Sequence, residues 1–212
     1  VYIVGYTDGT FGPSRSMTRS EAAAIFARLL AEKNGDTIST AANTKFADIP
    51  AHAWYSGYVK YLSNNGITYG KNKTIFAPND AITRAEFTTL AVRFFDVYGD
   101  GDAEIMEQFS GFNDVSSGYW AAEYIKYAAL HGWINGYGDG SFHADREINR
   151  AEVVTIVNRL LGREADADYI ADNLRKLNTF PDVTKRHWAY YAVMEAANAH
   201  TAVLGESESW SK

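Results

Sequence analysis

Three arginines recur at a nearly constant spacing, each in the same five-residue setting. Arg19, Arg84 and Arg150 lie 65 and 66 residues apart. A guanidinium group offers a planar fork of N–H donors that fits a carboxylate. The repeated arginines are therefore candidates for binding an anion. Their settings are Met17-Thr18-Arg19-Ser20-Glu21, Ile82-Thr83-Arg84-Ala85-Glu86 and Ile148-Asn149-Arg150-Ala151-Glu152.

The residues around each arginine predict the start of a helix. A threonine or asparagine precedes each arginine, and a glutamate lies three residues after that threonine or asparagine. This is the spacing of a capping box. The arginine then falls on the first helical position, where the helix dipole disfavours a cation by roughly 0.3–1 kcal/mol. An arginine nevertheless occupies this unfavourable position in all three copies, which favours a function for it. In that function the guanidinium and the helix N–H groups bind an anion together. The alternative is that each arginine packs its stem or pairs with a neighbouring acid.

In the residues that follow each arginine, apolar side chains recur at i, i+3, i+4, i+7 and i+8, as in an amphipathic helix. Three equivalent stripes can be buried against one another. The sequence therefore predicts a mainly α fold with a central three-helix bundle, approximate threefold symmetry and peripheral helices. The stripes are Ala22, Ile25, Phe26, Leu29 and Leu30; Phe87, Leu90, Ala91, Phe94 and Phe95; and Val153, Ile156, Val157, Leu160 and Leu161.

A long loop with an Asp-Gly turn leads into each predicted helix. It runs over residues 5–11 and 136–142, and a degraded copy at residues 70–76 lacks Asp-Gly and carries Lys71 and Lys73. Asp-Gly is a strong turn signal. In every copy a phenylalanine lies eight residues before the arginine, and we expect it to be buried under the loop. These are Phe11, Phe76 and Phe142.

The other half of each repeat joins a Phe-x-Asp motif to a tryptophan and a further helix. The aspartates are Asp48, Asp114 and Asp182, and the tryptophans are Trp54, Trp120 and Trp188. Large aromatic residues are usually well buried, so we expect the tryptophans to anchor the core, with a role at a sugar-binding surface as the alternative. Gly66 and Gly132 follow twelve residues after two of them, where a helix would end.

Composition restricts the possible functions. The chain of 212 residues is 46% hydrophobic, so it can bury a core, and its net charge of −6 argues against a nucleic-acid partner. No run of apolar residues is long enough to span a membrane. Cysteine is absent, and no motif of a hydrolase or nucleotide-binding enzyme is present. Residues 96–111 resemble a calcium loop only weakly, so we expect a solvated acidic loop and no metal or other cofactor.

The ordered motifs, from Phe-x-Asp and Trp through Gly-Tyr-x-Asp-Gly-x-Phe to Thr-Arg-Ala-Glu, resemble those of the S-layer homology (SLH) family. The resemblance implies whole modules at 46–99 and 112–162. It also implies the second half of a module at 1–35 and the first half of another, with a tail, at 180–212. The segment 163–179 is then a linker, and its helical spacing predicts a short helix. Because the chain begins inside a repeat with no visible signal peptide, we expect it to be part of a longer protein.

The resemblance also implies a function: non-catalytic, extracellular anchoring on the bacterial cell surface by binding an anionic cell-wall polysaccharide that often carries pyruvate ketals. The alternative from a different class is a protein–protein or self-assembly module of a surface layer, and a glycoside hydrolase is disfavoured because everything distinctive is repeated. The binding residues that the family pattern implies are Arg19, Arg84, Arg150, Asp48, Asp114, Asp182, Trp54, Trp120, Trp188, Gly66 and Gly132.

Overall fold

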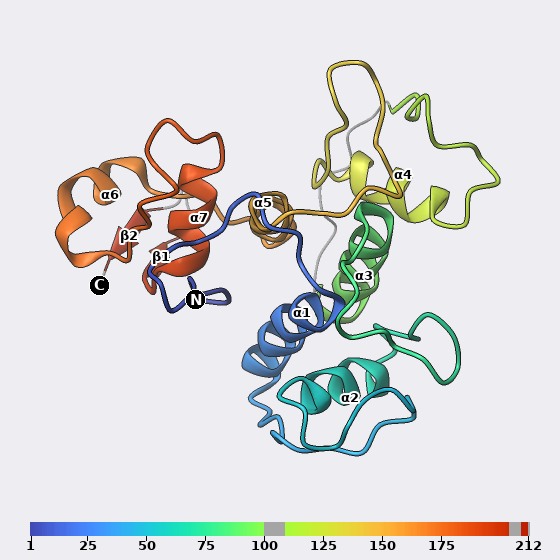
Figure 1. Cartoon of the computed structure of the whole chain (residues 1–212). Coiled ribbons are helices and arrows are strands. Elements are labelled where there is room, and N and C mark those ends of the chain that lie inside the picture. Colours follow the sequence, from blue (N-terminus) through green and yellow to red (C-terminus); the bar gives the residue numbers. More distant parts are fainter. Residues whose placement is uncertain (100–108, 204–208, 212) are drawn as a thin grey trace. The chain divides into compact units, whose positions relative to one another are not determined.

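The computed structural model describes residues 1–99, 109–203 and 209–211 (Figure 1). These residues form two compact units, a continuous unit of residues 16–148 and a split unit made of residues 1–15 and 149–212. Part of the predicted acidic loop, residues 100–108, lies outside the described residues. The predicted bundle of three helices would involve both units and stays a prediction.

The continuous unit consists of two helix pairs. The helices are α1 (Arg19–Asn34), α2 (Ser56–Asn64), α3 (Arg84–Tyr98) and α4 (Ala122–Leu130). In Figure 1, α1 packs beside α2 and α3 beside α4, and α1 and α3 also contact one another. The core between α1 and α3 contains Phe26, whose ring centroid lies 5.4 Å from that of Phe87 and 4.8 Å from that of Phe94. The predicted apolar stripes therefore form the contact between these two helices.

The split unit joins the beginning of the chain to its last third. It contains α5 (Arg150–Leu160), α6 (Ala167–Asn173), a 3-10 turn η1 (Leu174–Lys176) and α7 (Tyr190–Ala197). A two-stranded antiparallel hairpin follows, β1 (Thr201–Val203) and β2 (Ser209–Ser211), with Ala202 opposite Trp210. The N–H of Tyr2 donates to the carbonyl of Ala196 at 3.2 Å, and the rings of Phe11 and Phe180 lie 5.3 Å apart. The two partial repeats at the ends of the chain thus pack together inside this unit.

All three predicted capping boxes are present at the starts of α1, α3 and α5. In each box the side chain of the N-cap residue accepts from the glutamate N–H, and the glutamate carboxylate accepts from the N-cap N–H. The residues that precede the caps join in a closed ring of backbone hydrogen bonds. Met17 donates to Ile148, Ile148 to Ile82 and Ile82 to Met17, at 2.9 to 3.0 Å. This ring fixes where the three segments of the continuous unit meet.

The fold is mainly helical, as the sequence predicts. The loop phenylalanines Phe11, Phe76 and Phe142 are buried, which confirms the expectation from their spacing. Among the described residues, no helix combines the length and the apolar character that crossing a membrane would require.

Candidate functional site

The three repeated arginines are buried and make the same contact. Arg19, Arg84 and Arg150 are 7%, 5% and 4% exposed. Each donates from Nε, at 2.8 Å, to the carbonyl oxygen of a loop phenylalanine that belongs to another copy of the repeat. The guanidinium also lies over the ring of the same phenylalanine, at 4.5 to 5.1 Å. The alternative that the arginines have a packing role is therefore correct in part. The pairs are Arg19 with Phe76, Arg84 with Phe142 and Arg150 with Phe11.

The N–H groups at the start of these helices donate to acceptors within the protein. In α1 the N–H of Arg19 donates to the carbonyl of Asp80 and that of Ser20 to the carbonyl of Pro78, both at 3.0 Å. The next N–H bonds to the N-cap hydroxyl. The prediction that helix N–H groups help bind an anion is thus wrong, because the adjacent loop supplies the acceptors that a ligand would have supplied. The corresponding acceptors are the carbonyls of Arg146 and Ala144 for α3, and of Arg15 and Pro13 for α5.

Arg19 nevertheless faces an open pocket of about 370 Å³ within the continuous unit. Its Nη1 atom lies 3.1 Å from Glu86, so the guanidinium is paired but reaches the pocket wall. The wall is built from α1, α3, the chain that follows α2, and the turn before α4. The lining residues are Arg19, Ala23, Ile67, Thr68, Tyr69, Gly70, Lys71, Phe76, Ile82, Glu86, Thr89, Leu90, Arg93 and Trp120.

Cations outnumber carboxylates in this pocket. Glu86 Oε1 lies 3.1 Å from both Arg19 Nη1 and Lys71 Nζ, while its other oxygen accepts from the N–H of Thr83. Burial of the Glu86 carboxyl works against ionisation, but the Thr83 bond and the two cations outweigh it and lower its pKa. One carboxylate therefore faces three cations, since Arg93 also lines the pocket. A positive pocket in a chain with a net charge of −6 favours an anionic ligand.

The repeated tryptophans lie at the surface. Trp54, Trp120 and Trp188 are 53%, 57% and 65% exposed, so the expectation that they anchor the core is wrong. The buried anchor is the next residue in each copy, Tyr55, Ala121 or Ala189. The turn before the helix directs that neighbour inward and leaves the indole facing outward. Trp120 lines the Arg19 pocket, where its exposed ring offers a flat surface to a ligand.

The site residues predicted from the sequence did not include Arg93, the second arginine of this pocket. Arg93 lies between two tyrosine rings, 4.8 Å from Tyr69 and 5.0 Å from Tyr124, and it donates to the Tyr124 hydroxyl. Arg28 makes the same contact with Tyr58 in the preceding copy. The signal was available, because Arg28 and Arg93 follow Arg19 and Arg84 by nine residues each.

The repeated aspartates hold the loops in place. Asp48 accepts from the N–H groups of Phe76 and Ala77, at 2.9 and 2.6 Å. Asp114 and Asp182 accept in the same way from the two N–H groups that begin at Phe142 and Phe11. These contacts fix the phenylalanine carbonyl that each arginine uses. The structure thus gives the aspartates a positioning role.

The two predicted glycines end helices. Gly66 and Gly132 follow α2 and α4 by two residues, at φ values of 73° and 69°, a conformation in which a side chain would be strained. The chain that leaves Gly66 turns at once into the pocket wall formed by residues 67–71. Gly66 therefore positions this wall.

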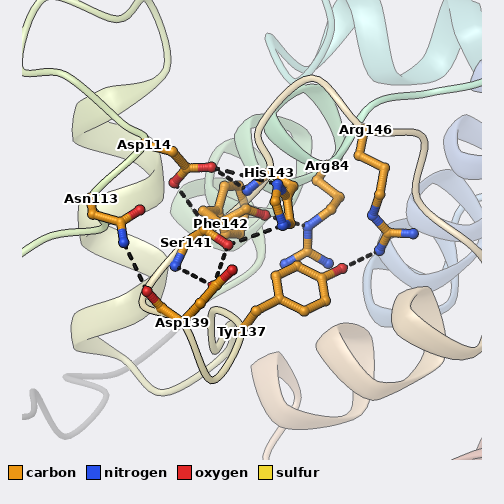
Figure 2. Close-up of polar contacts among 9 residues, drawn as sticks. All are labelled: Arg84, Asn113, Asp114, Tyr137, Asp139, Ser141, Phe142, His143 and Arg146. Atoms are coloured by element: carbon orange, nitrogen blue, oxygen red, sulfur yellow. Dashed lines mark hydrogen bonds and ion pairs between the residues drawn. The ribbon is translucent and has the colours of Figure 1, made fainter.

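Figure 2 shows the polar contacts of the equivalent loop around Arg84. The carboxylate of Asp139 accepts from the N–H and hydroxyl of Ser141, at 3.0 and 2.6 Å, and these bonds lower its pKa. The Ser141 hydroxyl also lies 3.0 Å from His143 Nε2. The Tyr137 ring lies against the guanidinium of Arg84, 5.2 Å from its centre, and its hydroxyl accepts from Arg146. Hydrogen bonds within the loop thus hold its residues together.

In the part of the chain that the structure describes, no group of three or more acidic or histidine side chains could hold a metal ion.

Comparison with known proteins gives the family. The S-layer homology domain profile matches residues 2–23, 45–88 and 111–154. Cell surface glycoprotein 1 of Acetivibrio thermocellus is 34% identical over 98% of this chain, which spans 9% of that protein. The Cellulosome-anchoring protein of the same organism is 30% identical over 97% of the chain and 44% of its own length. The Surface-layer 125 kDa protein of Lysinibacillus sphaericus is 31% identical over 75% of the chain and 13% of its own length.

The chain thus spans less than half the length of these relatives. Their names indicate an extracellular location on the bacterial cell surface. The profile matches the three segments that carry the repeated arginines, and together they cover half of the sequence. The chain therefore belongs to the S-layer homology domain family.

Proposed function

We propose that this chain is a non-catalytic anchoring module that binds an anionic cell-wall polysaccharide in the Arg19 pocket. The observation that carries the proposal is the composition of that pocket. Three cations and one carboxylate line it, beside an indole that is 57% exposed. Such a surface suits a pyranose ring that carries a carboxylate, because the ring stacks on the indole while the acid meets the cations.

The ligand acid would bind to Arg19 and Lys71, which both lie 3.1 Å from the same oxygen of Glu86. Trp120 and Tyr69, both exposed, would contact the faces of the sugar rings. A pyruvate ketal, which the family resemblance implies, places a carboxylate directly on a sugar ring and fits this arrangement. Of the residues that the family pattern implies, Arg19 and Trp120 then touch the ligand, while Asp48 and Gly66 hold the wall.

The relatives support the anchoring role. One is named for anchoring a cellulosome and another for a surface layer, and each is matched over only part of its length. A module that adheres to the wall polymer would serve either protein in the same way. We infer the same role for this chain, with the polymer as its partner.

Titration calorimetry of the chain against purified cell-wall polysaccharide tests the proposal. Polymer whose carboxylates have been chemically reduced to alcohols is the matched control ligand. We expect binding to the native polymer, at least tenfold weaker binding to the reduced polymer, and no release of reducing sugar. Equal binding to both polymers would contradict the anionic ligand, and hydrolysis would contradict the non-catalytic role. A stable oligomer by light scattering, together with no polymer binding, would favour self-assembly instead.

A further inference from the structure

The three arginine sites differ in the aromatic rings that contact the guanidinium. Arg84 and Arg150 each lie against a second aromatic ring besides the loop phenylalanine. That ring is Tyr137 for Arg84, at 5.2 Å, and Tyr6 for Arg150, at 4.7 Å. The corresponding loop position near Arg19 is Lys71.

The covering tyrosines are themselves held by arginines. The guanidinium of Arg15 lies 4.1 Å from the Tyr6 ring, and that of Arg146 lies 5.6 Å from the Tyr137 ring. Each of these arginines precedes the repeated arginine of its copy by four residues, and the same position in the middle copy is Asp80. The middle copy thus has a lysine in place of the tyrosine and an aspartate in place of the arginine. It therefore lacks the tyrosine, held by an arginine, that covers the guanidinium in the other two copies.

Without that cover, the space beside Arg19 is the pocket described above. Lys71 extends into its wall and binds Glu86 at 3.1 Å, so the lysine partly neutralises the carboxylate that pairs with Arg19. The pocket is also lined by Thr89, which is 3% exposed. Within the described residues its hydroxyl has no hydrogen-bond partner, whereas the corresponding Thr155 donates to a backbone carbonyl at 2.9 Å. A buried hydroxyl without a partner is costly, which indicates a polar ligand group or water in the occupied pocket.

We propose that Lys71 and Asp80 are the specificity determinants that make the Arg19 pocket the principal acidic-sugar site of the chain. This inference rests on the proposed function and deepens it. The repeated arginines are then not equivalent: Arg84 and Arg150 hold their loops, whereas Arg19 also meets the ligand. Lys71 supplies the second cation for the sugar carboxylate, and Asp80 keeps the tyrosine–arginine cover from forming.

The first test is stoichiometry, with a hexose methyl glycoside that bears a pyruvate ketal as the probe. Calorimetry on the full chain is expected to find a single site, and the probe's carboxyl methyl ester is expected to bind about tenfold more weakly, the loss of one charge-assisted hydrogen bond. Three equal sites would overturn the inference. If neither the probe nor the cell-wall polymer binds, the proposed function itself fails.

The second test uses three variants, each measured with the probe, its ester and the polymer. Lys71→Met is expected to weaken binding of the acid about tenfold and leave the ester unchanged. The double variant Lys71→Tyr with Asp80→Arg restores the cover, and is expected to weaken both acid and ester. Lys73→Met, which removes an exposed charge two residues away, serves as the matched control and should bind as the wild type does.

Circular dichroism of each variant shows that it is folded before binding is compared. Wild-type affinity for the acid in Lys71→Met would overturn the assignment of Lys71. Undiminished binding in the double variant would overturn the covering role of the tyrosine. If Lys73→Met lost as much affinity for the acid as Lys71→Met, the effect would come from the net charge of the chain and not from the position of Lys71. That result would also contradict the inference.

Discussion

Replacing Asp48 with asparagine separates the two roles that a repeated aspartate can have in this fold. The carboxylate accepts from the N–H groups of Phe76 and Ala77, at 2.9 and 2.6 Å. These bonds fix the Phe76 carbonyl, to which Arg19 donates. Asp48 does not line the Arg19 pocket. We therefore expect the substitution to lower the stability of the fold and leave the affinity of the folded chain unchanged.

The magnitude follows from the two bonds. A hydrogen bond to a charged group contributes about 1.5–3 kcal/mol, and asparagine can retain one of the two acceptors in a weaker, neutral form. Asp48 is only partly buried, so solvent screening reduces the loss further. We expect the free energy of unfolding to fall by about 2 kcal/mol. With a urea dependence of about 2 kcal/mol per M, the unfolding midpoint should fall by about 1 M.

Urea unfolding followed by far-ultraviolet circular dichroism measures the stability, and calorimetry with the cell-wall polymer measures the affinity. Asp172→Asn, which alters an exposed carboxylate on α6, is the control for the change in charge. If Asp48→Asn weakened polymer binding tenfold while the unfolding midpoint stayed at its wild-type value, the positioning role would be refuted. Asp48 would then be the direct sugar ligand that the family pattern implies.

Four further predictions follow from single contacts. Ala77 has a φ of 59°, so Ala77→Gly should raise the free energy of unfolding by about 1 kcal/mol in urea titrations. Thr83→Ala removes a helix cap and should lower it by about 1 kcal/mol, also measured with urea. Trp120→Ala should weaken binding of the polymer in calorimetry by more than about 1 kcal/mol without changing the thermal midpoint, because the exposed ring would contact the proposed ligand and not the core. Burial opposes ionisation of Asp114, but two backbone N–H bonds outweigh it and lower its pKa. The stability that Asp114 contributes is thus present above the unfolded pKa of about 3.9 and is lost as the pH falls through the folded pKa. In Asp114→Asn, the urea unfolding midpoint should therefore fall less steeply as the pH is lowered.

The sequence predicted the features that depend on local chemistry. Capping boxes, helix-ending glycines and apolar stripes each involve residues within about one or two turns of helix, where spacing alone decides the contact. All three boxes at Thr18, Thr83 and Asn149 form as their residue types predict. The burial of the loop phenylalanines could be predicted for a related reason, since the spacing to the capped helix is the same in every copy.

The predictions that were wrong concern features that depend on the direction of a side chain or on a partner far along the chain. Trp120 and the buried Ala121 are adjacent in sequence, and only the path of the turn decides which of them faces the core. The N–H groups at the start of α1 are taken by loop carbonyls about 60 residues away, which no local pattern could show. The ion pair of Arg19 with Glu86 likewise joins two copies of the motif.

Repetition by itself does not identify the residues that bind. The contact between an arginine and a loop phenylalanine is present at Arg19, Arg84 and Arg150 alike, with the same Nε distance of 2.8 Å. A contact that is identical in every copy explains why the arginine is repeated, but it cannot distinguish an open pocket from a covered one. In our proposal, that distinction lies where the copies differ, at Lys71 and Asp80. The repeat then builds the scaffold, and the departures from it determine which arginine an acidic sugar can reach.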